Sequence, residues 1–310
     1  MSKKIVVSVA EESLFNELKN LPEIDVLMWD MTGPAPVPEI DIVVPPYMDG
    51  EAPLAQLAGV QVKLVQWQSI GYDGVEEHLP NGIPFANART VHETSTAELA
   101  VGLAIAAQRG IPEAVEAKTR RAWEPVFRPS LADRKILLLG YGGVSKAIEA
   151  RLQPFETEIT RVASVARAER NSEGKTVHVH GISEVANLIG DAEIVIVGLP
   201  LNETTAGLID ATMLARLQND ALLINVGRGA VVDTAALVKE LESGRIRAAL
   251  DVVDPEPLPS DHPLWGCENL LLMPHVGGDT SAMLPRIVAL IKKQVQNLID
   301  GEPFENLVSL

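Results

Sequence analysis

Residues 135–147 read Lys-Ile-Leu-Leu-Leu-Gly-Tyr-Gly-Gly-Val-Ser-Lys-Ala, and this stretch decides the fold class. The apolar run at its start predicts a buried strand, which enters a glycine-rich turn and then a helix. A glycine pattern in this strand-to-helix context is typical of a dinucleotide-binding motif. An ordinary turn that uses glycine only for its backbone freedom is the competing interpretation.

In the dinucleotide interpretation the glycines have separate tasks. Gly140 allows the tight turn, and Gly142 lets the backbone approach a pyrophosphate at the helix N-terminus. Gly143 and Val144 follow directly and complete the predicted pyrophosphate contact. The last motif position is Ser145, where glycine or alanine is usual, so we expect slight crowding between helix and strand.

The strand predicted at 159–165 bears on the choice of cofactor. NAD-binding proteins usually end this strand with an acidic residue that binds the ribose 2′-hydroxyl. Ala163 and Ser164 stand there instead, and Arg167 and Arg170 follow. A missing carboxylate beside guanidinium groups favours a 2′-phosphate, so we expect NADP as the preferred cofactor and NAD as the alternative. A solvated loop whose arginines face water would imply no preference.

The 310 residues exceed the usual size of a single core, so two domains are expected. Short apolar runs alternate with helical patterns, which indicates an α/β fold with doubly wound parallel sheets. The predicted strands of the N-terminal third lie near 4–9, 24–29, 40–44 and 62–67. A second series begins at 135–139 and continues near 159–165, 176–180, 193–199, 222–227, 248–252 and 269–273.

Two helices are expected to mark the passage between the domains. Ser95 and Glu98 have capping-box spacing, and the apolar run Leu99–Ala107 after them predicts a buried helix. Residues 281–300 predict an amphipathic helix. If this last helix packs on the N-terminal domain, the nucleotide-binding domain is an insertion. We therefore expect domains at 1–97 plus 279–310 and at 98–278.

Composition and charge limit the classes of partner that the protein is expected to bind. A formal charge of −16 argues against nucleic acid and anionic membranes. Residues 1–9 predict a strand and not a signal peptide, and the one cysteine, Cys267, fits a reducing compartment, so a cytoplasmic protein is expected. His178 and His180 share one face of a strand without a third ligand, so no metal site is expected.

Each of three later predicted strands is followed by a residue that could take part in catalysis. Arg228 follows the run at 222–227, Glu256 follows the run at 248–252, and His275 follows the run at 269–273. Residues just past the carboxyl ends of parallel strands face the ligand crevice. A fixed cation, a carboxylate and an imidazole in one place could move a proton on a carboxylate-bearing substrate beside a hydride donor.

The chain resembles the D-isomer-specific 2-hydroxyacid dehydrogenases over nearly its whole length. The matching phrases, in order, are the glycine turn, Leu199–Thr205, Asn225–Gly229, Asp251–Leu258 and Pro274–Gly278. The resemblance implies a Rossmann nucleotide-binding domain inserted into a flavodoxin-like substrate domain, a homodimer, and reversible reduction of 2-keto acids. Ser145 and the absent acid near Ala163 depart from the family pattern and bear on NAD against NADP.

The resemblance also implies roles for single residues. Arg228 would bind the substrate and polarise its carbonyl, and His275, paired with Glu256, would donate and accept the proton. The nicotinamide would lie near Thr96, and the residues flanking the cofactor would be Val197, Pro200, Val226, Asp251 and Gly277.

The N-terminal domain would bind the other side of the substrate. Residues 68–74 resemble the family's carboxylate-binding loop, in which backbone N–H groups near Ser69, Ile70 and Gly71 form an anion site. A plain strand-to-helix turn is a serious alternative. Residues 45–48 end another strand, and Tyr47 or Met48 would line the pocket.

The substrate expected first is a small 2-keto acid such as glyoxylate or hydroxypyruvate. Some relatives with this fold act chiefly as nucleotide-sensing scaffold proteins, and that class is the alternative. A related Rossmann enzyme acting on amino acids or thioethers is less favoured, since it would give no reason for Arg228, Glu256 and His275 to occur in this order.

Overall fold

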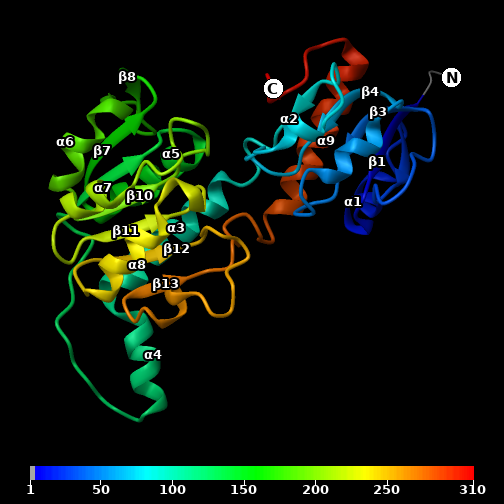
Figure 1. Ribbon diagram of the computed structural model, residues 1–310. Helices are drawn as coiled ribbons and strands as arrows, with labels where there is room; N and C mark the ends of the chain where they lie inside the picture. Colours follow the sequence, from blue (N-terminus) through cyan, green and yellow to red (C-terminus); the bar gives the residue numbers. More distant parts are fainter. Residues whose placement is uncertain (1–3) are drawn as a thin grey trace. The chain divides into compact units, whose positions relative to one another are not determined.

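The computed structural model of the protein describes residues 4–310. The chain folds into two compact units (Figure 1). The first unit is the chain up to His92 together with Thr280–Leu310, and the second is the continuous segment Glu93–Asp279. In the sequence, the second unit is therefore an insertion into the first.

The first unit is built on a six-stranded sheet with the order β14-β5-β4-β3-β1-β2. Its strands are β1 (Ile5–Val9), β2 (Ile24–Met28), β3 (Glu39–Val44), β4 (Gln61–Gln66), β5 (Phe85–Ala86) and β14 (Leu307–Val308). Only the pairing of β14 with β5 is antiparallel among these strands. The connecting helices are α1 (Glu12–Leu18), the 3-10 helix η1 (Ala52–Leu57) and α2 (Val75–His78). The four predicted strands are confirmed, whereas two-residue β5 and β14 are too short to give a sequence pattern.

The last helix, α9 (Met283–Asp300), packs on the first unit, as its amphipathic pattern predicts. Its apolar side chains Ile287, Ile291 and Val295 are buried with Val7 of β1 and Leu64 of β4. The chain therefore leaves the first unit after His92 and returns to it with α9.

The second unit contains an eight-stranded sheet with the order β13-β12-β11-β10-β6-β7-β9-β8. Its strands are β6 (Lys135–Leu139), β7 (Glu158–Ala163), β8 (Arg167–Arg170), β9 (Thr176–Gly181), β10 (Ile194–Val197), β11 (Leu222–Asn225), β12 (Arg247–Leu250) and β13 (Leu270–Leu272). Apart from the β8–β9 hairpin, the pairings of these strands are parallel. The strand order reverses direction at β6 and β10, and ligands of such sheets bind at the carboxyl ends beside this reversal.

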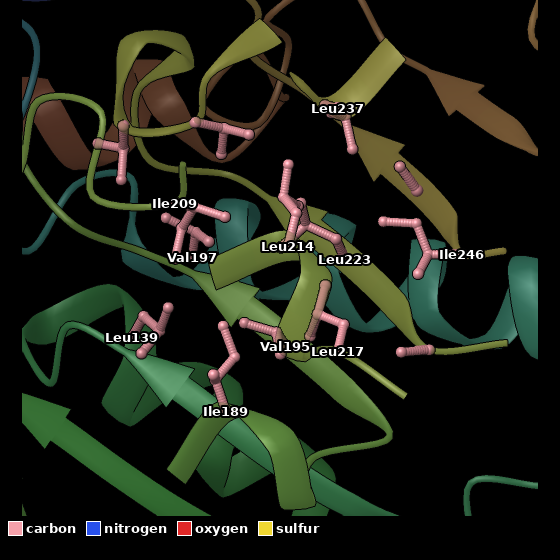
Figure 2. Close-up of a cluster of buried hydrophobic side chains, with 14 of the residues drawn as sticks. Leu139, Ile189, Val195, Val197, Ile209, Leu214, Leu217, Leu223, Leu237 and Ile246 are labelled. Carbon is pink, nitrogen blue, oxygen red and sulfur yellow. The ribbon is translucent and has the colours of Figure 1, made fainter. Parts of the chain in front are cut away.

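Helices cover both faces of this sheet, because alternate residues of the central strands point to opposite sides. On one face, residues such as Leu138 and Ile196 pack against α3 (Glu93–Arg109) and α5 (Gly143–Leu152). On the other face, α7 (Ala211–Arg216) and α8 (Thr234–Glu242) contribute to a second core, and Figure 2 shows its residues Leu139, Val195, Val197, Leu223, Leu214 and Leu237. The predicted doubly wound α/β architecture is confirmed.

One local prediction is wrong. Helix α3 begins at Glu93, so Ser95 lies buried inside its first turn and cannot be the N-cap of a capping box. The solvated loop considered as the alternative after Val165 is not formed, because Arg167–Arg170 is strand β8, antiparallel to β9. The buried helix over 99–107 is confirmed, and it is the middle of α3. Between residues 4 and 310, no helix has the length and apolarity to cross a bilayer.

Candidate active site

The glycine turn after β6 has the geometry that its sequence predicts. Gly140 has a φ of +91°, and a Cβ atom there would lie 2.7 Å from the carbonyl oxygen of Gly198, so glycine is required. Gly142 is the N-cap of α5 and is exposed, with no heavy atom within 4 Å of the position of a Cβ. Gly143 is also exposed, and Val144 is half-buried behind it. A Cβ on Gly143 would lie 2.9 Å from the Glu93 side chain, so of these three glycines only Gly142 has open space beside it.

The expected crowding at Ser145 is relieved by a second glycine. Ser145 is buried, and a Cβ on Gly198, the residue after β10, would lie 2.7 Å from its Oγ. The hydroxyl therefore occupies the space that a side chain at position 198 would need. Serine is tolerated here because the opposing strand end has no side chain.

Arg167 lies beside the glycine turn, although not as a free loop residue. It begins β8, and its Nη2 donates a hydrogen bond of 3.4 Å to the carbonyl oxygen of Tyr141 in the turn. Its Nη2 also pairs with Glu169 Oε2 at 2.8 Å, and the same carboxylate binds Lys146 of α5. Ser164 is exposed directly after β7. Lys146 and Glu169 were not among the predicted site residues, and their contact joins residues 23 positions apart, which the sequence does not reveal.

Hydrogen bonds from a buried asparagine and close backbone packing hold the turn that carries Arg228. Asn225, the last residue of β11, is 1% exposed, and its side chain donates to the carbonyl of Arg228 at 2.9 Å and accepts from the N–H of Gly227 at 3.0 Å. A Cβ on Gly229 would lie 1.8 Å from the carbonyl oxygen of Val253, so no other residue fits there. The guanidinium itself donates from Nη1 to the Gly227 carbonyl at 2.8 Å.

Glu256 and His275 form a direct pair. The Nδ1 of His275 lies 2.9 Å from Oε1 of Glu256, and both side chains are about one-third exposed, at 32% and 37%. His275 has a φ of +53°, which non-glycine residues adopt rarely and which is often found at functional sites. Glu256 lies between two prolines whose peptide bonds are cis.

The charges that act on His275 include those of both other predicted catalytic residues, Glu256 and Arg228. The hydrogen bond with Glu256 raises the pKa of His275 above its ordinary value, and partial burial opposes this rise. The negative charges of Glu256 and Asp251 raise the pKa further, and the positive charge of Arg228 lowers it. Arg228 is therefore close enough to act electrostatically on the imidazole. Oxyanion binding and proton donation are both available in this arrangement.

Asp251 fixes the backbone that presents His275. Its carboxylate is 2% exposed and accepts hydrogen bonds from the N–H groups of Val276 at 2.8 Å and Gly277 at 2.9 Å. Its own carbonyl accepts the N–H of His275 at 2.8 Å. Gly277 also lies against Thr96 of α3, whose Cγ2 would be 3.3 Å from a Cβ at that position. Asp251, Gly277 and Thr96 thus form one packed group next to the backbone that carries His275.

Two other predicted cofactor residues lie at neighbouring strand ends. Pro200 is exposed in the loop after β10, where its carbonyl accepts the Thr205 hydroxyl at 2.6 Å. Val226 follows β11, donates its N–H to the Val197 carbonyl at 3.0 Å, and buries its side chain in the core against α3. The side chain of Val226 is therefore part of the core, and its backbone lies at the end of β11.

The first unit holds the loop that follows β4. The carbonyls of Ser69, Ile70 and Gly71 accept hydrogen bonds from Ala88 N at 2.9 Å, Asn87 Nδ2 at 2.9 Å and Trp67 Nε1 at 3.0 Å. In a trans peptide unit the N–H of the next residue points away from the carbonyl. The N–H groups of Ile70 and Gly71 consequently point away from these donors.

Tyr47 belongs to the same unit and is held by its backbone. Its N–H donates to Glu11 Oε1 at 2.7 Å, and its ring stacks on His92 with 5.9 Å between ring centroids. Glu11 also accepts from Gln68 at 3.0 Å. Within the described residues, no group of three or more His, Cys, Asp or Glu side chains has metal-binding geometry.

Comparisons with known proteins identify the family of the chain. Residues 101–277 match the sequence model of the D-isomer specific 2-hydroxyacid dehydrogenase NAD binding domain. The glyoxylate reductase/hydroxypyruvate reductase of Homo sapiens is 28% identical over 311 residues, which cover 94% of this chain and 93% of that protein. The glyoxylate reductase of Thermofilum pendens is 33% identical over 255 residues, with coverages of 79% and 74%.

Solved structures show the same fold. A D-isomer specific 2-hydroxyacid dehydrogenase from Xanthobacter autotrophicus Py2, crystallised with NADPH and MES, is 26% identical with a TM-score of 0.79 and covers 98% of both chains. An NADPH-dependent glyoxylate/hydroxypyruvate reductase from Sinorhizobium meliloti, crystallised with NADP and sulfate, has a TM-score of 0.83 over 99% of this chain and 98% of that one. At 21% identity, the second likeness concerns the fold alone.

Proposed function

The chain belongs to the D-isomer specific 2-hydroxyacid dehydrogenases and is an NAD(P)-dependent enzyme, and on this premise we propose that it reduces a small 2-keto acid of the glyoxylate or hydroxypyruvate type. The product is the D-2-hydroxy acid, and the reaction is reversible. The observation that carries this proposal is the 2.9 Å pair of His275 and Glu256 within electrostatic reach of Arg228. The reductases of Homo sapiens and Thermofilum pendens support the substrate class by their names.

Arg228 binds the substrate in this proposal. Its planar guanidinium can contact a carboxylate oxygen and the keto oxygen together, which a lysine cannot do with the same geometry. The positive charge stabilises the negative charge that develops on the keto oxygen. The Asn225 hydrogen bonds and the close packing of Gly229 keep this cation in place before substrate arrives.

His275 supplies the proton. Its Nδ1 is occupied by Glu256, so Nε2 is the nitrogen that gives a proton to the nascent alkoxide and takes it back in the oxidation direction. The raised pKa keeps the imidazole protonated at neutral pH more often than a free histidine. A bound NAD(P)H supplies the hydride.

The cofactor is held by residues of the second unit. The turn at Gly140, Gly142 and Gly143 is proposed to bind the pyrophosphate, with open space at Gly142, and Val144 lies in the first turn of α5 just behind it. Thr96, Pro200, Val226, Asp251 and Gly277 are the proposed neighbours of the nicotinamide half. Ser164 and Arg167 are proposed to favour NADP over NAD, since a cation stands by the turn and the end of β7 has no acid.

The loop of the first unit is proposed to bind the substrate carboxylate. The outward N–H groups of Ile70 and Gly71, with the neighbouring Ser69, form the donor set that an anion needs. Tyr47, fixed through Glu11, is proposed to contact the rest of the substrate.

We also propose a cytoplasmic homodimer. Helix α4 (Ile111–Thr119) and the segment after it expose Trp123 at 95% and Phe127 at 98%. Large exposed apolar groups that are close in sequence are typical of protein interfaces. The single cysteine, Cys267, is free, as in proteins of reducing compartments.

A spectrophotometric assay tests the function. NADPH and NADH are each mixed with the protein and with glyoxylate, hydroxypyruvate, pyruvate or a longer 2-keto acid, and oxidation of the cofactor is followed. We expect turnover with NADPH and one of the small acids. Tight binding of a cofactor without turnover of any acid would contradict the proposal and favour a nucleotide-sensing scaffold.

A further inference from the structure

A three-residue ion cluster lies beside the glycine turn, and we define it as the Lys146–Arg167–Glu169 cluster. Lys146 lies on α5, while Arg167 and Glu169 lie on the edge strand β8 (Figure 1). The carboxylate of Glu169 receives Lys146 at one oxygen, and at the other it receives Arg167 Nε at 2.9 Å and Nη2 at 2.8 Å. One anion thus holds two cations.

The cluster is attached to the cofactor motif. Arg167 Nη2 donates to the carbonyl of Tyr141, which stands between Gly140 and Gly142. Lys146 follows these glycines on the same helix and lies 5.7 Å from the centre of the Tyr141 ring. In folds of this kind, the adenosine ribose lies between the glycine turn and the end of the next strand, here Ser164. The side chains remain reachable, since Lys146 is 46% and Arg167 39% exposed.

The contacts of Glu169 are those that a phosphate would make. A 2′-phosphate needs a guanidinium and a second cation around its oxygens, and here a carboxylate takes both cations. The cluster keeps a net positive charge because it contains two cations and one anion. An incoming phosphate must therefore compete with Glu169 for groups that would otherwise bind it strongly.

We propose that Glu169 sets how strongly the protein distinguishes NADP(H) from NAD(H), by holding Lys146 and Arg167 in the place of a 2′-phosphate. Lys146 is thereby assigned as a second phosphate-binding cation. This inference rests on the proposed cofactor site but requires no particular keto acid. It makes Glu169 a residue that weakens NADP(H) binding and has no effect on the adenosine common to both cofactors.

Binding of two probes to the purified full-length protein tests the inference. Adenosine 2′,5′-bisphosphate carries the 2′-phosphate and 5′-AMP lacks it, and calorimetry gives a dissociation constant for each. For Glu169→Gln we expect the bisphosphate to bind about fivefold more tightly, as for the loss of one partly exposed ionic competitor. The affinity for 5′-AMP should stay within about twofold, and the gain should shrink as salt is raised.

Glu173→Gln is the matched control. Glu173 lies in the same hairpin and pairs with Lys175 at 3.1 Å, so the control removes the same charge without touching the cluster. Lys146→Gln is the second variant and should weaken only the bisphosphate. An unchanged affinity ratio in Glu169→Gln, or an equal gain in Glu173→Gln, would overturn the inference, as would a ratio unaffected by Lys146→Gln. The two binding constants do not depend on turnover of a keto acid. A negative reductase assay would therefore count against the proposed function without changing the result of this test.

Discussion

The Nδ1 atom of His275 lies 2.9 Å from Oε1 of Glu256, although 19 residues separate them. The pair joins the loop after β12 to the loop after β13, and these strands are neighbours in the sheet. The contact fixes the ring and raises the pKa of His275, while the second ring nitrogen stays available for proton transfer. Proton transfer in the proposed reaction depends on this pair more than on any other contact.

Replacing Glu256 by glutamine should lower the pKa of His275. The carboxylate contributes both the hydrogen bond and the negative charge that raise this pKa, and glutamine keeps neither charge nor acceptor strength. Reduction needs the protonated imidazole, so its rate falls as pH rises through the pKa of His275. In Glu256→Gln that fall should begin at a lower pH than in the wild type, because the main cause of the raised pKa is gone.

The profile of kcat/KM against pH for keto-acid reduction measures this shift. Asp254→Asn is the control, because Asp254 is an exposed carboxylate in the same loop that does not contribute to the pKa of His275. An alkaline limb at the same pH in wild type and Glu256→Gln would refute the role of the pair.

Asp251→Asn should destabilise the second unit. Each carboxylate oxygen of this buried residue accepts a backbone N–H, from Val276 or Gly277. An asparagine must turn its NH2 group toward one of these donors, which leaves a buried N–H without an acceptor and costs about 1–3 kcal/mol. Chemical denaturation, with Asp254→Asn as control, should show this loss in the free energy of unfolding. Equal stability of the two variants would mean that the loop has another anchor.

Gly229→Ala should misplace the turn that carries Arg228. The new methyl group would lie 1.8 Å from the carbonyl oxygen of Val253, so the backbone must move. We expect a loss of about 3 kcal/mol in stability, as in severe overpacking, and a fall in activity. Gly102→Ala in α3 is the control, because nothing lies within 4 Å of a Cβ at that exposed helical position, and it should stabilise the protein by about 0.5–1 kcal/mol. A Gly229→Ala variant with the stability and activity of the wild type would show that the turn can accommodate the methyl group.

Tyr141→Phe should change the response of stability to alkaline pH. Burial raises the pKa of Tyr141 to about 12, and its hydroxyl also donates to the buried carboxylate of Glu149. In the unfolded chain the phenol ionises near its ordinary value of 10.0. The unfolded state thus releases the proton first, and the contribution of Tyr141 to stability is full below pH 10 and is lost as pH rises toward about 12.

Wild type should therefore lose stability between pH 10 and about 12 faster than Tyr141→Phe. Below that window the variant should be less stable by about 1 kcal/mol because it lacks one buried hydrogen bond. Urea unfolding at pH 8, 10 and 11 measures both effects. Parallel curves for the two proteins would contradict the buried, neutral phenol.

The central strands could be predicted because each one is a continuous apolar run that can be recognised without knowing which strands it pairs with. Parallel strands that are covered on both faces need continuous apolar sequence, as in the runs at 136–139 and 194–197. Strand β8 gave no such signal, since Arg-Ala-Glu-Arg is polar and forms a strand only by pairing with β9. The start of α3 was misplaced for a related reason: serine at position 95 has cap chemistry, but the helix begins earlier and buries it.

In the candidate site, too, features that depend on contacts between distant residues could not be predicted. Strand ends are visible in the sequence, so Arg228, Glu256 and His275 could be predicted to lie together. The groups that orient them could not, because the Asp251 hydrogen bonds span 25 and 26 residues and depend on a left-handed backbone at His275. The Glu169 pairing likewise needs the hairpin that the sequence does not reveal.

The central claim is that His275 donates the proton in keto-acid reduction, and one comparison tests it most directly. The kcat for NADPH oxidation with the best small keto acid is measured for wild type, His275→Ala and His78→Ala, which replaces a half-buried histidine of the first unit. We predict that His275→Ala lowers kcat by about 100-fold or more, as for loss of a general acid. His78→Ala should match wild type, and the Kd for NADPH should be the same in all three proteins. A His275→Ala enzyme with near wild-type kcat would contradict the account.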